Sequence, residues 1–263
     1  MFRMLKLKPP HGWNAVAWEL GIVAVGVLVA LGAQQLADNL NSRAQARKAT
    51  AAMRAELADH YAFSVEWRVT TPCLIAQIDR LQDRLMRSGD RLDPAPVFNE
   101  PGIPAFVLRI PTKDYDSSAW HAAIADGVTA YLAPDQRTEL SQHYQQAAGM
   151  AELTTRNGTS SEQVFSLSRA IPLDPAVRFS LMQSLDELRG RVHYMDLVSG
   201  QLIDHITRLD MVPEPGVAAH LLETSGTRLF CAQHGLPMRS LRDADKAIPY
   251  QYSPLDPGRA ERK

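Results

Sequence analysis

Residues 15–37 read AVAWELGIVAVGVLVALGAQQLA, and this stretch decides the architecture of the chain. The run from Leu20 to Leu36 contains no charged residue. As an α-helix the whole stretch would extend roughly 34 Å, which is enough to cross a hydrocarbon core of about 30 Å. Trp18 and Glu19 lie near one edge, where an indole ring suits the membrane interface and a carboxylate can reach water. We therefore predict a transmembrane helix over residues 15–37.

Two other interpretations of this segment stay open. A cleaved signal peptide would account for the basic start at Arg3, Lys6 and Lys8, for the apolar run, and for small residues around positions 30–32. A buried core helix would also be apolar, but a helix in a globular core is rarely apolar on all faces. We favour a retained anchor, because the apolar run continues into a helical pattern and nothing breaks the helix where cleavage would be needed.

The basic residues around the segment do not decide its orientation. They lie on both sides of it, at Arg3, Lys6 and Lys8 before it and at Arg43, Arg47, Lys48 and Arg54 after it. We expect the N-terminal tail to be cytoplasmic, because long domains cross the membrane largely regardless of the flanking charge. The run from Arg43 to Arg54 is then a solvated face; on the cytoplasmic side it could instead bind anionic lipid headgroups.

The composition of the chain is typical of one folded domain. The chain has 263 residues, of which 45% are hydrophobic and 22% charged, and its formal net charge is -1. This length is sufficient for a buried core, and the balanced charge argues against a nucleic-acid partner. No second apolar run of membrane-spanning length follows residue 37, so we predict a single-pass protein.

A long stretch without helix breakers follows the membrane segment. Residues 33–71 contain neither proline nor glycine, which predicts one rod from about residue 13 to residue 69. Thr71 and Pro72 fit a helix cap and the first position of a new helix. A stripe of small and aliphatic residues would let a partner helix approach the rod closely: Leu36, Leu40, Ala44, Ala51, Ala55, Ala58, Ala62, Val65 and Val69.

Proline and glycine divide the rest of the chain into helices and loops. The proline-rich residues 90–111 predict a loop or short extended pieces. Residues 107–110 could form a lone strand, but a lone strand has no partner to pair with. Three helices should follow, beginning near residues 116–118 (with Trp120, Ile124 and Tyr131), at Pro134 (ending at Asn157–Gly158) and at Asp174–Pro175 (residues 176–212). After Met211 the pattern is irregular, with one short helix near residues 216–223.

The predicted fold is therefore all-α. We divide the chain into a cytoplasmic tail (1–14), a transmembrane helix (15–37), an extracytoplasmic helical bundle (38–212) and an irregular C-terminal extension (213–263). The last residues, 256–263, are charged and are predicted to be mobile. No part of the extension has a pattern that would give it a core of its own.

Two stretches of the sequence resemble a known family. One is the apolar helix led by Trp18–Glu19–Leu20, which runs into Ala33–Gln34–Gln35; the other is residues 118–123 (SAWHAA), with Gly127, Leu140 and Tyr144. Together they resemble small membrane-anchored proteins of Gram-negative bacteria that carry a domain of unknown function. The resemblance implies a single-pass protein of the bacterial inner membrane with a periplasmic helical domain. It implies no activity and supplies no functional residues.

The sequence carries no motif for catalysis or cofactor binding. It has no G-x-S-x-G, H-E-x-x-H, C-x-x-C, G-x-G-x-x-G or P-loop pattern, and no paired E-x-x-H. We therefore expect neither an enzyme nor a cofactor. His193 and Asp196, three residues apart, could share a face and bind a metal ion, and Asp204 and His205 lie further along the same helix. We interpret these polar residues instead as the solvated face of the helix. Trp120, Tyr131 and Tyr144 could line a ligand groove, but aromatic residues at helical spacing more often form a core.

Two cysteines, Cys73 and Cys231, both follow the membrane segment. In an oxidising compartment they could form a disulfide that ties the C-terminal extension to the bundle. Two free thiols would be the expected state in the cytosol. We favour the disulfide, which in the entropic model would stabilise the fold by about 3–5 kcal/mol.

The membrane segment itself contains two pairs of small residues at four-residue spacing. They are Ala17 with Gly21 and Gly26 with Ala30. Such pairs permit close contact between membrane helices, although they also occur in apolar helices by chance. They are our candidate positions for self-association within the membrane.

These features favour a membrane-anchored, non-catalytic helical interaction or scaffold module of the bacterial cell envelope. Its expected partners are the lipid bilayer and either a second copy of the chain or another protein. The alternative is an extracytoplasmic small-ligand-binding or sensory domain that acts through a partner protein.

Overall fold

The computed structural model of the chain describes residues 13–100, 102–214 and 216–249. The predicted cytoplasmic tail lies outside this part apart from its last two residues, as do the charged residues 256–263. The fold is all-α, as predicted. The long helices are α1 (Trp13–Arg87), α3 (Pro134–Val164) and α4 (Pro175–Arg208).

The shorter elements lie between and after these helices. Between α1 and α3 are the strands β1 (Phe98–Glu100) and β2 (Ile103–Phe106), the helix α2 (Ser118–Ala125) and the 3-10 helix η1 (Val128–Tyr131). The 3-10 helix η2 (Phe165–Ser168) joins α3 to α4. The C-terminal extension carries α5 (Val217–Thr224), α6 (Gly226–Gln233) and α7 (Leu241–Ala244).

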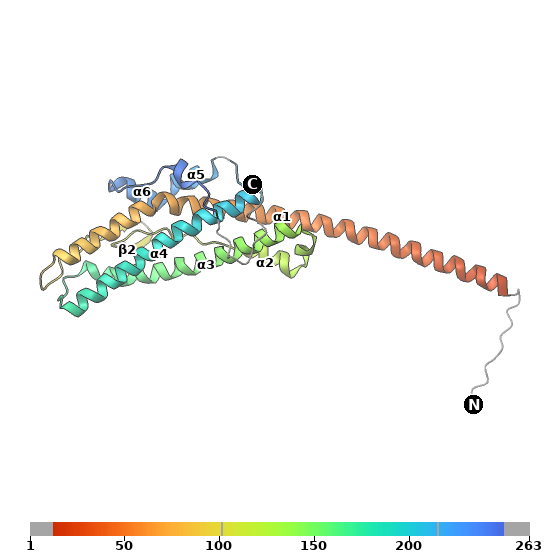
Figure 1. The fold of residues 1–263 in the computed structure, drawn as a ribbon, viewed down its shortest axis with the longest axis horizontal. Helices are drawn as coiled ribbons and strands as arrows, with labels where there is room; N and C mark the ends of the chain where they lie inside the picture. Colours follow the sequence, from red (N-terminus) through yellow and green to blue (C-terminus); the bar gives the residue numbers. More distant parts are fainter. Residues whose placement is uncertain (1–12, 101, 215, 250–263) are drawn as a thin grey trace, which may run out of the picture.

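The three long helices form the bundle, with α4 in contact with both α1 and α3. The C-terminal helices α5, α6 and α7 also contact α1, and Figure 1 shows α5 and α6 on the side of α1 away from α3. α1 leaves the bundle at the end where α2 lies and continues alone as a single extended helix (Figure 1). The bundle therefore surrounds only the C-terminal half of α1.

The free part of α1 is long and apolar enough to cross a membrane. Residues 17–41 are exposed throughout, and they include the large apolar side chains of Leu20, Ile22 and Leu28. The interpretation of this segment as a buried core helix of the chain is therefore wrong.

The prediction that a new helix begins at Thr71–Pro72 is also wrong, because α1 continues through Pro72. A proline inside a helix lacks the N–H that would bond to the preceding turn, and it usually bends the helix. Neighbouring groups bond to the carbonyls of that turn. The carbonyl of Val69 accepts the N–H of Arg239 at 3.0 Å, and the hydroxyl of Thr71 donates to the carbonyl of Trp67 at 2.8 Å. α1 bends within the bundle (Figure 1).

The predicted end of α3 at Asn157–Gly158 is wrong as well, because the helix runs on to Val164. Asn157 is buried and is held by α4. Its side-chain amide donates to the sulfur of Met195 at 2.9 Å, and its oxygen accepts from Nε of Arg191 at 3.1 Å. Packing against α4 outweighs the local cost of about 1 kcal/mol for a glycine inside a helix.

The predicted starts of α3 and α4 are confirmed. α3 begins at Pro134, and the side chain of Asp174 caps α4 by accepting the N–H of Val177 at 2.8 Å. The helix predicted to carry Trp120 and Tyr131 is divided, because Gly127 adopts a positive φ of 67° and ends α2 before η1 begins. The chain therefore turns between these two aromatic residues.

Short extended pieces are present in residues 90–111, as expected, whereas the alternative of a lone strand at residues 107–110 does not form. The strands are β1 and β2, which pair as an antiparallel hairpin with Phe98 opposite Phe106 and Glu100 opposite Ile103. A lone strand lacks hydrogen-bond partners, whereas the segment just before residue 107 can pair with itself. Residues 107–110 instead form an irregular buried stretch.

In the described part of the C-terminal extension the chain is irregular between three short helices. The short helix predicted near residues 216–223 is present as α5. The helices α6 and α7 were not predicted. Their serine caps are local signals, since Ser225 accepts the N–H of Arg228 and Ser240 that of Asp243.

Candidate functional site

α1 is enclosed on all sides where the C-terminal helices cover it. Its residues 60–71 are buried except for the half-buried Phe63. Half of these residues are polar: His60, Ser64, Glu66, Arg68, Thr70 and Thr71. A buried polar group destabilises a fold unless it forms hydrogen bonds, so the partners of these side chains show how the elements are held together.

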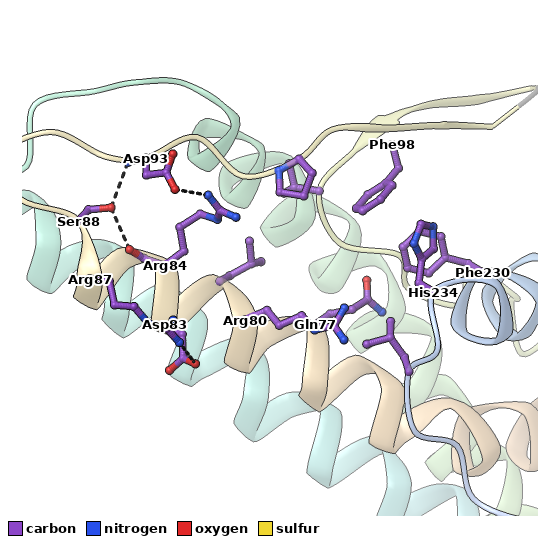
Figure 2. A pocket seen from close by; sticks show the side chains of 14 residues that line it. Gln77, Arg80, Asp83, Arg84, Arg87, Ser88, Asp93, Phe98, Phe230 and His234 are labelled. Carbon is purple, nitrogen blue, oxygen red and sulfur yellow. Dashed lines mark hydrogen bonds and ion pairs between the residues drawn. The ribbon is translucent and has the colours of Figure 1, made fainter.

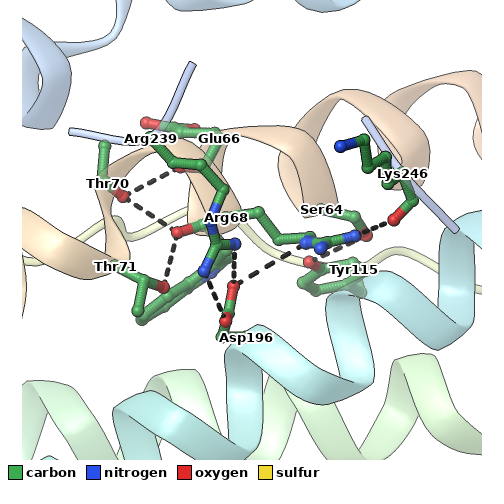
Figure 3. Close-up of polar contacts among 10 residues, drawn as sticks. Ser64, Glu66, Arg68, Thr70, Thr71, Tyr115, Asp196, Arg239 and Lys246 are labelled. Carbon is green, nitrogen blue, oxygen red and sulfur yellow. Dashed lines mark hydrogen bonds and ion pairs between the residues drawn. The ribbon is translucent and has the colours of Figure 1, made fainter. Parts of the chain in front are cut away.

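Asp196 of α4 joins α1 to the C-terminal extension (Figure 3). Its two carboxylate oxygens accept from Nη1 and Nη2 of Arg239 at 2.6 and 2.9 Å, and one of them lies 3.7 Å from Nε of Arg68. Arg68 also donates to the carbonyl of Lys246. Burial lowers the pKa of Arg68 below its usual value, while the hydrogen bonds to Asp196 raise the pKa of Arg239.

Two buried histidines join α1, α3 and the segment before α2. Nε2 of His60 lies 2.6 Å from the carbonyl oxygen of Asp116, so this nitrogen carries the proton. Nδ1 of His60 then accepts from Nε2 of His143 at 2.9 Å. As a result Nδ1 of His143 is an unprotonated nitrogen without a hydrogen-bond partner among the described residues. Burial lowers the pKa of His60 to about 4 and that of His143 well below its usual value.

A third buried histidine contributes to the contact between α3 and α4. His205 bonds to Glu139, which also pairs with Arg208 at 2.8 Å, and Arg208 pairs with Asp204 at 3.0 Å. The solvated face that we predicted for these residues is therefore wrong for His205, whereas His193 is exposed. Within the described ranges no three or more metal-binding side chains lie together. This network connects α3 to α4.

The three aromatic residues that could have lined a groove do not do so. Trp120 and Tyr144 are buried and stacked, with ring centroids 5.3 Å apart and an interplanar angle of 6°. Tyr131 is 54% exposed on η1. The interpretation as core residues therefore holds for Trp120 and Tyr144 only.

Cys73 of α1 and Cys231 of α6 are joined by a disulfide in the structure, with their Cα atoms 6.0 Å apart. Both cysteines are fully buried. They pack in one apolar cluster with Phe106, Phe230 and Leu236. The disulfide thus fixes α6 against α1 beside the hairpin.

The two small-residue pairs of the apolar segment lie on opposite faces of α1. All four residues, Ala17, Gly21, Gly26 and Ala30, are exposed. A helix turns by about 100° per residue, so positions 17 and 26 are half a turn apart. A single helix–helix contact can therefore use one pair or the other but not both.

A cavity of about 460 Å³ lies between α1, the loop that precedes β1, and α6 (Figure 2). Its apolar lining includes Leu81, Val107, Phe230 and Leu236, each of which is at most 6% exposed. Aromatic rings from the hairpin and α6 form one wall. The centroid of Phe98 lies 5.0 Å from that of Phe230. The size and lining are typical of a small-molecule site.

Arginine residues of α1 line the same cavity. Arg84 is paired with Asp93 and donates to the carbonyl of Pro94 at 3.0 Å. Arg87 is paired with Asp83 on its own helix (Figure 2). The cavity is our candidate functional site, and sequence reasoning missed it. The spacing of Arg80, Arg84 and Arg87 along one helical face was a signal that could have indicated it.

Comparisons with models of protein families, with curated proteins and with solved structures found no match to this chain.

Proposed function

We propose that this protein is a membrane-anchored, non-catalytic helical interaction module of the bacterial cell envelope. The observation that carries the proposal is that the apolar segment and the domain share one continuous helix, α1. The apolar part of α1 is exposed, and the C-terminal part lies in the bundle. A continuous helix has no flexible linker, so the domain would be held at a fixed distance and orientation relative to the bilayer.

An exposed stripe on α1 supports a partner helix as the binding target. The stripe consists of Leu36, Leu40, Ala44, Ala51 and Ala55, which lie within about 100° of one another around the helix. Gly26 and Ala30 continue it into the membrane segment, whereas Ala17 and Gly21 do not. The half-buried residues Ser42, Ala46 and Ala49 lie on the opposite side, towards the bundle. Small residues on an exposed face allow close approach of a second copy or of another single-pass protein.

We further propose an inner-membrane location, with the N-terminus in the cytoplasm and the domain in the periplasm. The disulfide between Cys73 and Cys231 supports this orientation, because disulfides persist in oxidising compartments. The resemblance to membrane-anchored proteins of Gram-negative bacteria points to the same place. The balanced net charge of -1 gives no reason to propose a nucleic-acid partner.

The anchor is tested by alkaline extraction of membranes that contain the full chain with a reporter at its C-terminus. We expect the intact chain in the membrane pellet and the reporter on the periplasmic side. A soluble chain that begins near residue 33 would overturn the anchor and would indicate a cleaved signal peptide.

The stripe is tested by placing a photo-cross-linking side chain at Ala44 and, as a control, at Gln45. Both positions are exposed, and they lie at nearly the same distance from the membrane segment but about 100° apart around α1. We expect one discrete larger species from position 44 and much less from position 45. Equal cross-linking at the two positions would contradict a specific contact through the stripe.

A second candidate function is the binding of a small ligand by the extracytoplasmic domain, acting through a partner. The cavity of about 460 Å³ favours it. A rise in the melting temperature of the full chain with a bound small molecule would support this function, since a ligand stabilises the folded state to which it binds.

A further inference from the structure

We infer that the cavity between α1 and α6 binds a small water-soluble organic anion with an apolar, ring-containing body. The anionic group would pair with Arg80. This inference rests on the second candidate function and names the class of ligand. It does not depend on the stripe of α1, and the membrane anchor enters only in the argument that the ligand is water-soluble.

The apolar body of the ligand is indicated by the inner wall of the cavity. Leu81, Val107 and Leu236 contribute aliphatic side chains to the lining. Phe98 and Phe230 meet edge to face at an interplanar angle of 83°, and Phe106 packs 5.5 Å from Phe230 behind them. Flat rings at such angles offer both faces and edges to a further ring. A planar apolar group of the ligand would therefore be held here.

The negative charge of the ligand is indicated by the charged side chains that line the cavity. Arg84 and Arg87 are already neutralised by Asp93 and Asp83. Arg80 lies on the same face of α1, beside Gln77 (Figure 2), and forms no ion pair with any described residue. The cavity lining therefore contains three arginines and two aspartates, which leaves one uncompensated positive charge. A guanidinium with free N–H groups recognises carboxylate and sulfonate groups well.

Three further polar side chains line the site. Ser88 is held by its neighbours, since its hydroxyl donates to the carbonyl of Arg84 and accepts the N–H of Asp93. Gln77 is held by the backbone of Arg109, from which it accepts the N–H at 2.8 Å. The ring of His234 packs against that of Phe230, with centroids 4.4 Å apart and an interplanar angle of 43°, and neither of its ring nitrogens bonds to a described residue. An imidazole beside the aromatic wall can donate a second hydrogen bond to an anion.

The position of the cavity along α1 argues against a bilayer lipid as the ligand. The cavity begins at Gln77, which is about 40 residues beyond the end of the apolar segment at residue 37. At 1.5 Å per residue this separation is roughly 60 Å, measured along the helix. A lipid that stays in the membrane cannot span this distance. The ligand must reach the site through water, so it must be soluble.

The test uses the full chain in nanodiscs of zwitterionic lipid and isothermal titration calorimetry. The probe is 2-naphthoate, and its neutral counterpart is 2-naphthamide, which has the same ring system without the charge. Empty nanodiscs provide the reference for partition into lipid. We expect saturable binding of 2-naphthoate with one site per chain and clearly weaker binding of 2-naphthamide.

The variant Arg80→Gln removes the unpaired charge from an exposed position. We expect it to weaken the binding of 2-naphthoate about fivefold and to leave the binding of 2-naphthamide within twofold, as fits a solvent-exposed ion pair. The matched control is Arg54→Gln, which removes an exposed arginine of the same helix far from the cavity. Its affinities should equal those of the unchanged chain.

Three results would overturn the inference. They are the absence of saturable binding of 2-naphthoate, equal weakening of both probes by Arg80→Gln, and equal weakening of 2-naphthoate by Arg54→Gln. None of them bears on the membrane anchor, which is tested by alkaline extraction, or on the stripe of α1, which is tested by cross-linking. Failure of the ligand site can therefore be told apart from failure of the proposed interaction module.

Discussion

Gly200 of α4 lies directly against Ile248 of the C-terminal extension. The N–H of Ile248 donates to the carbonyl of Gly200 at 2.9 Å. A Cβ atom added at Gly200 would come within 2.5 Å of Cδ1 and Cγ1 of Ile248, which is closer than real contacts allow. The glycine is therefore the position at which Ile248 of the extension docks on the bundle.

The same helix offers a matched glycine, and this gives the first prediction. A Cβ at Gly190 would meet no atom within 4 Å, so Gly190→Ala should raise the free energy of unfolding by about 1 kcal/mol through helix propensity. Gly200→Ala gains the same propensity but must displace Ile248, so we expect a net loss of about 1 kcal/mol. Urea unfolding of both variants in mild detergent measures the difference. Equal stabilisation by the two substitutions would contradict the docking.

A second prediction concerns the disulfide, which joins residues 158 positions apart. The double variant Cys73→Ala/Cys231→Ala should lower the free energy of unfolding by about 2–5 kcal/mol. It should also make α6 and the adjacent residues more sensitive to protease, because α6 is then held by packing alone. Dithiothreitol should destabilise the unchanged chain to a similar extent and leave the double variant unaffected. A double variant as stable as the oxidised chain would show that the disulfide does not stabilise the fold.

The local signals in the sequence predicted those elements whose boundaries depend on local chemistry. Asp174 followed by proline predicted the start of α4, and the run free of proline and glycine predicted a long rod. The predictions failed where tertiary contacts outweighed local preference. Pro72 lies inside α1, and in the turn before it Arg239, distant in sequence, donates its N–H to the carbonyl of Val69. No local pattern around residue 72 contains this information.

The candidate site was less predictable than the fold. The cavity exists because the hairpin, α1 and α6 meet, and these elements are far apart in the sequence. Arg80 and Phe98 gave no signal individually, since exposed arginines and loop aromatics are common. The pairing of Cys73 with Cys231 was the one long-range relationship open to sequence reasoning, because two cysteines allow a single intramolecular partner.

A third prediction follows from the buried histidines. The pKa of His60 is lowered by burial to about 4, so His60 is neutral in the folded chain while the unfolded chain is protonated below about pH 6.5. The unfolded state therefore binds more protons between these values, and stability is present above pH 6.5 and lost as the pH falls towards 4. The expected loss is about 3 kcal/mol from His60, with a further loss from His143, whose pKa is shifted in the same direction.

Unfolding free energies measured from pH 7 to pH 4 test this prediction. Other titratable groups also lie near His60, namely Asp116, Tyr115 and Tyr144. The pH dependence of the unfolding free energy should therefore be compared with that of a variant at His60 itself. His60→Gln can still donate to the Asp116 carbonyl and should flatten the profile. His193→Gln, at an exposed position, should not. A profile that is unchanged by His60→Gln would show that other groups cause the acid sensitivity.

The last prediction concerns Asp196, which accepts from Arg239 and lies beside Arg68 in a largely buried group (Figure 3). Asp196→Asn removes the negative charge but keeps the shape, so two guanidinium groups would face each other without a counter-ion. We expect a loss of about 3 kcal/mol, because removing one member of a buried ion pair leaves the other charge desolvated and unpaired. Hydrogen exchange should increase in the extension around Arg239.

The matched control for this variant is Asp83→Asn. Asp83 pairs with Arg87 at 2.9 Å on the exposed end of α1, where water already solvates both side chains. An exposed ion pair contributes less than about 1 kcal/mol, so this substitution should leave the unfolding free energy nearly unchanged. If Asp196→Asn were equally mild, the C-terminal extension would be held by the disulfide and apolar packing, and the ion pairs beneath it would contribute little. A large difference between the two variants would instead show that Asp196 fastens the extension to the bundle.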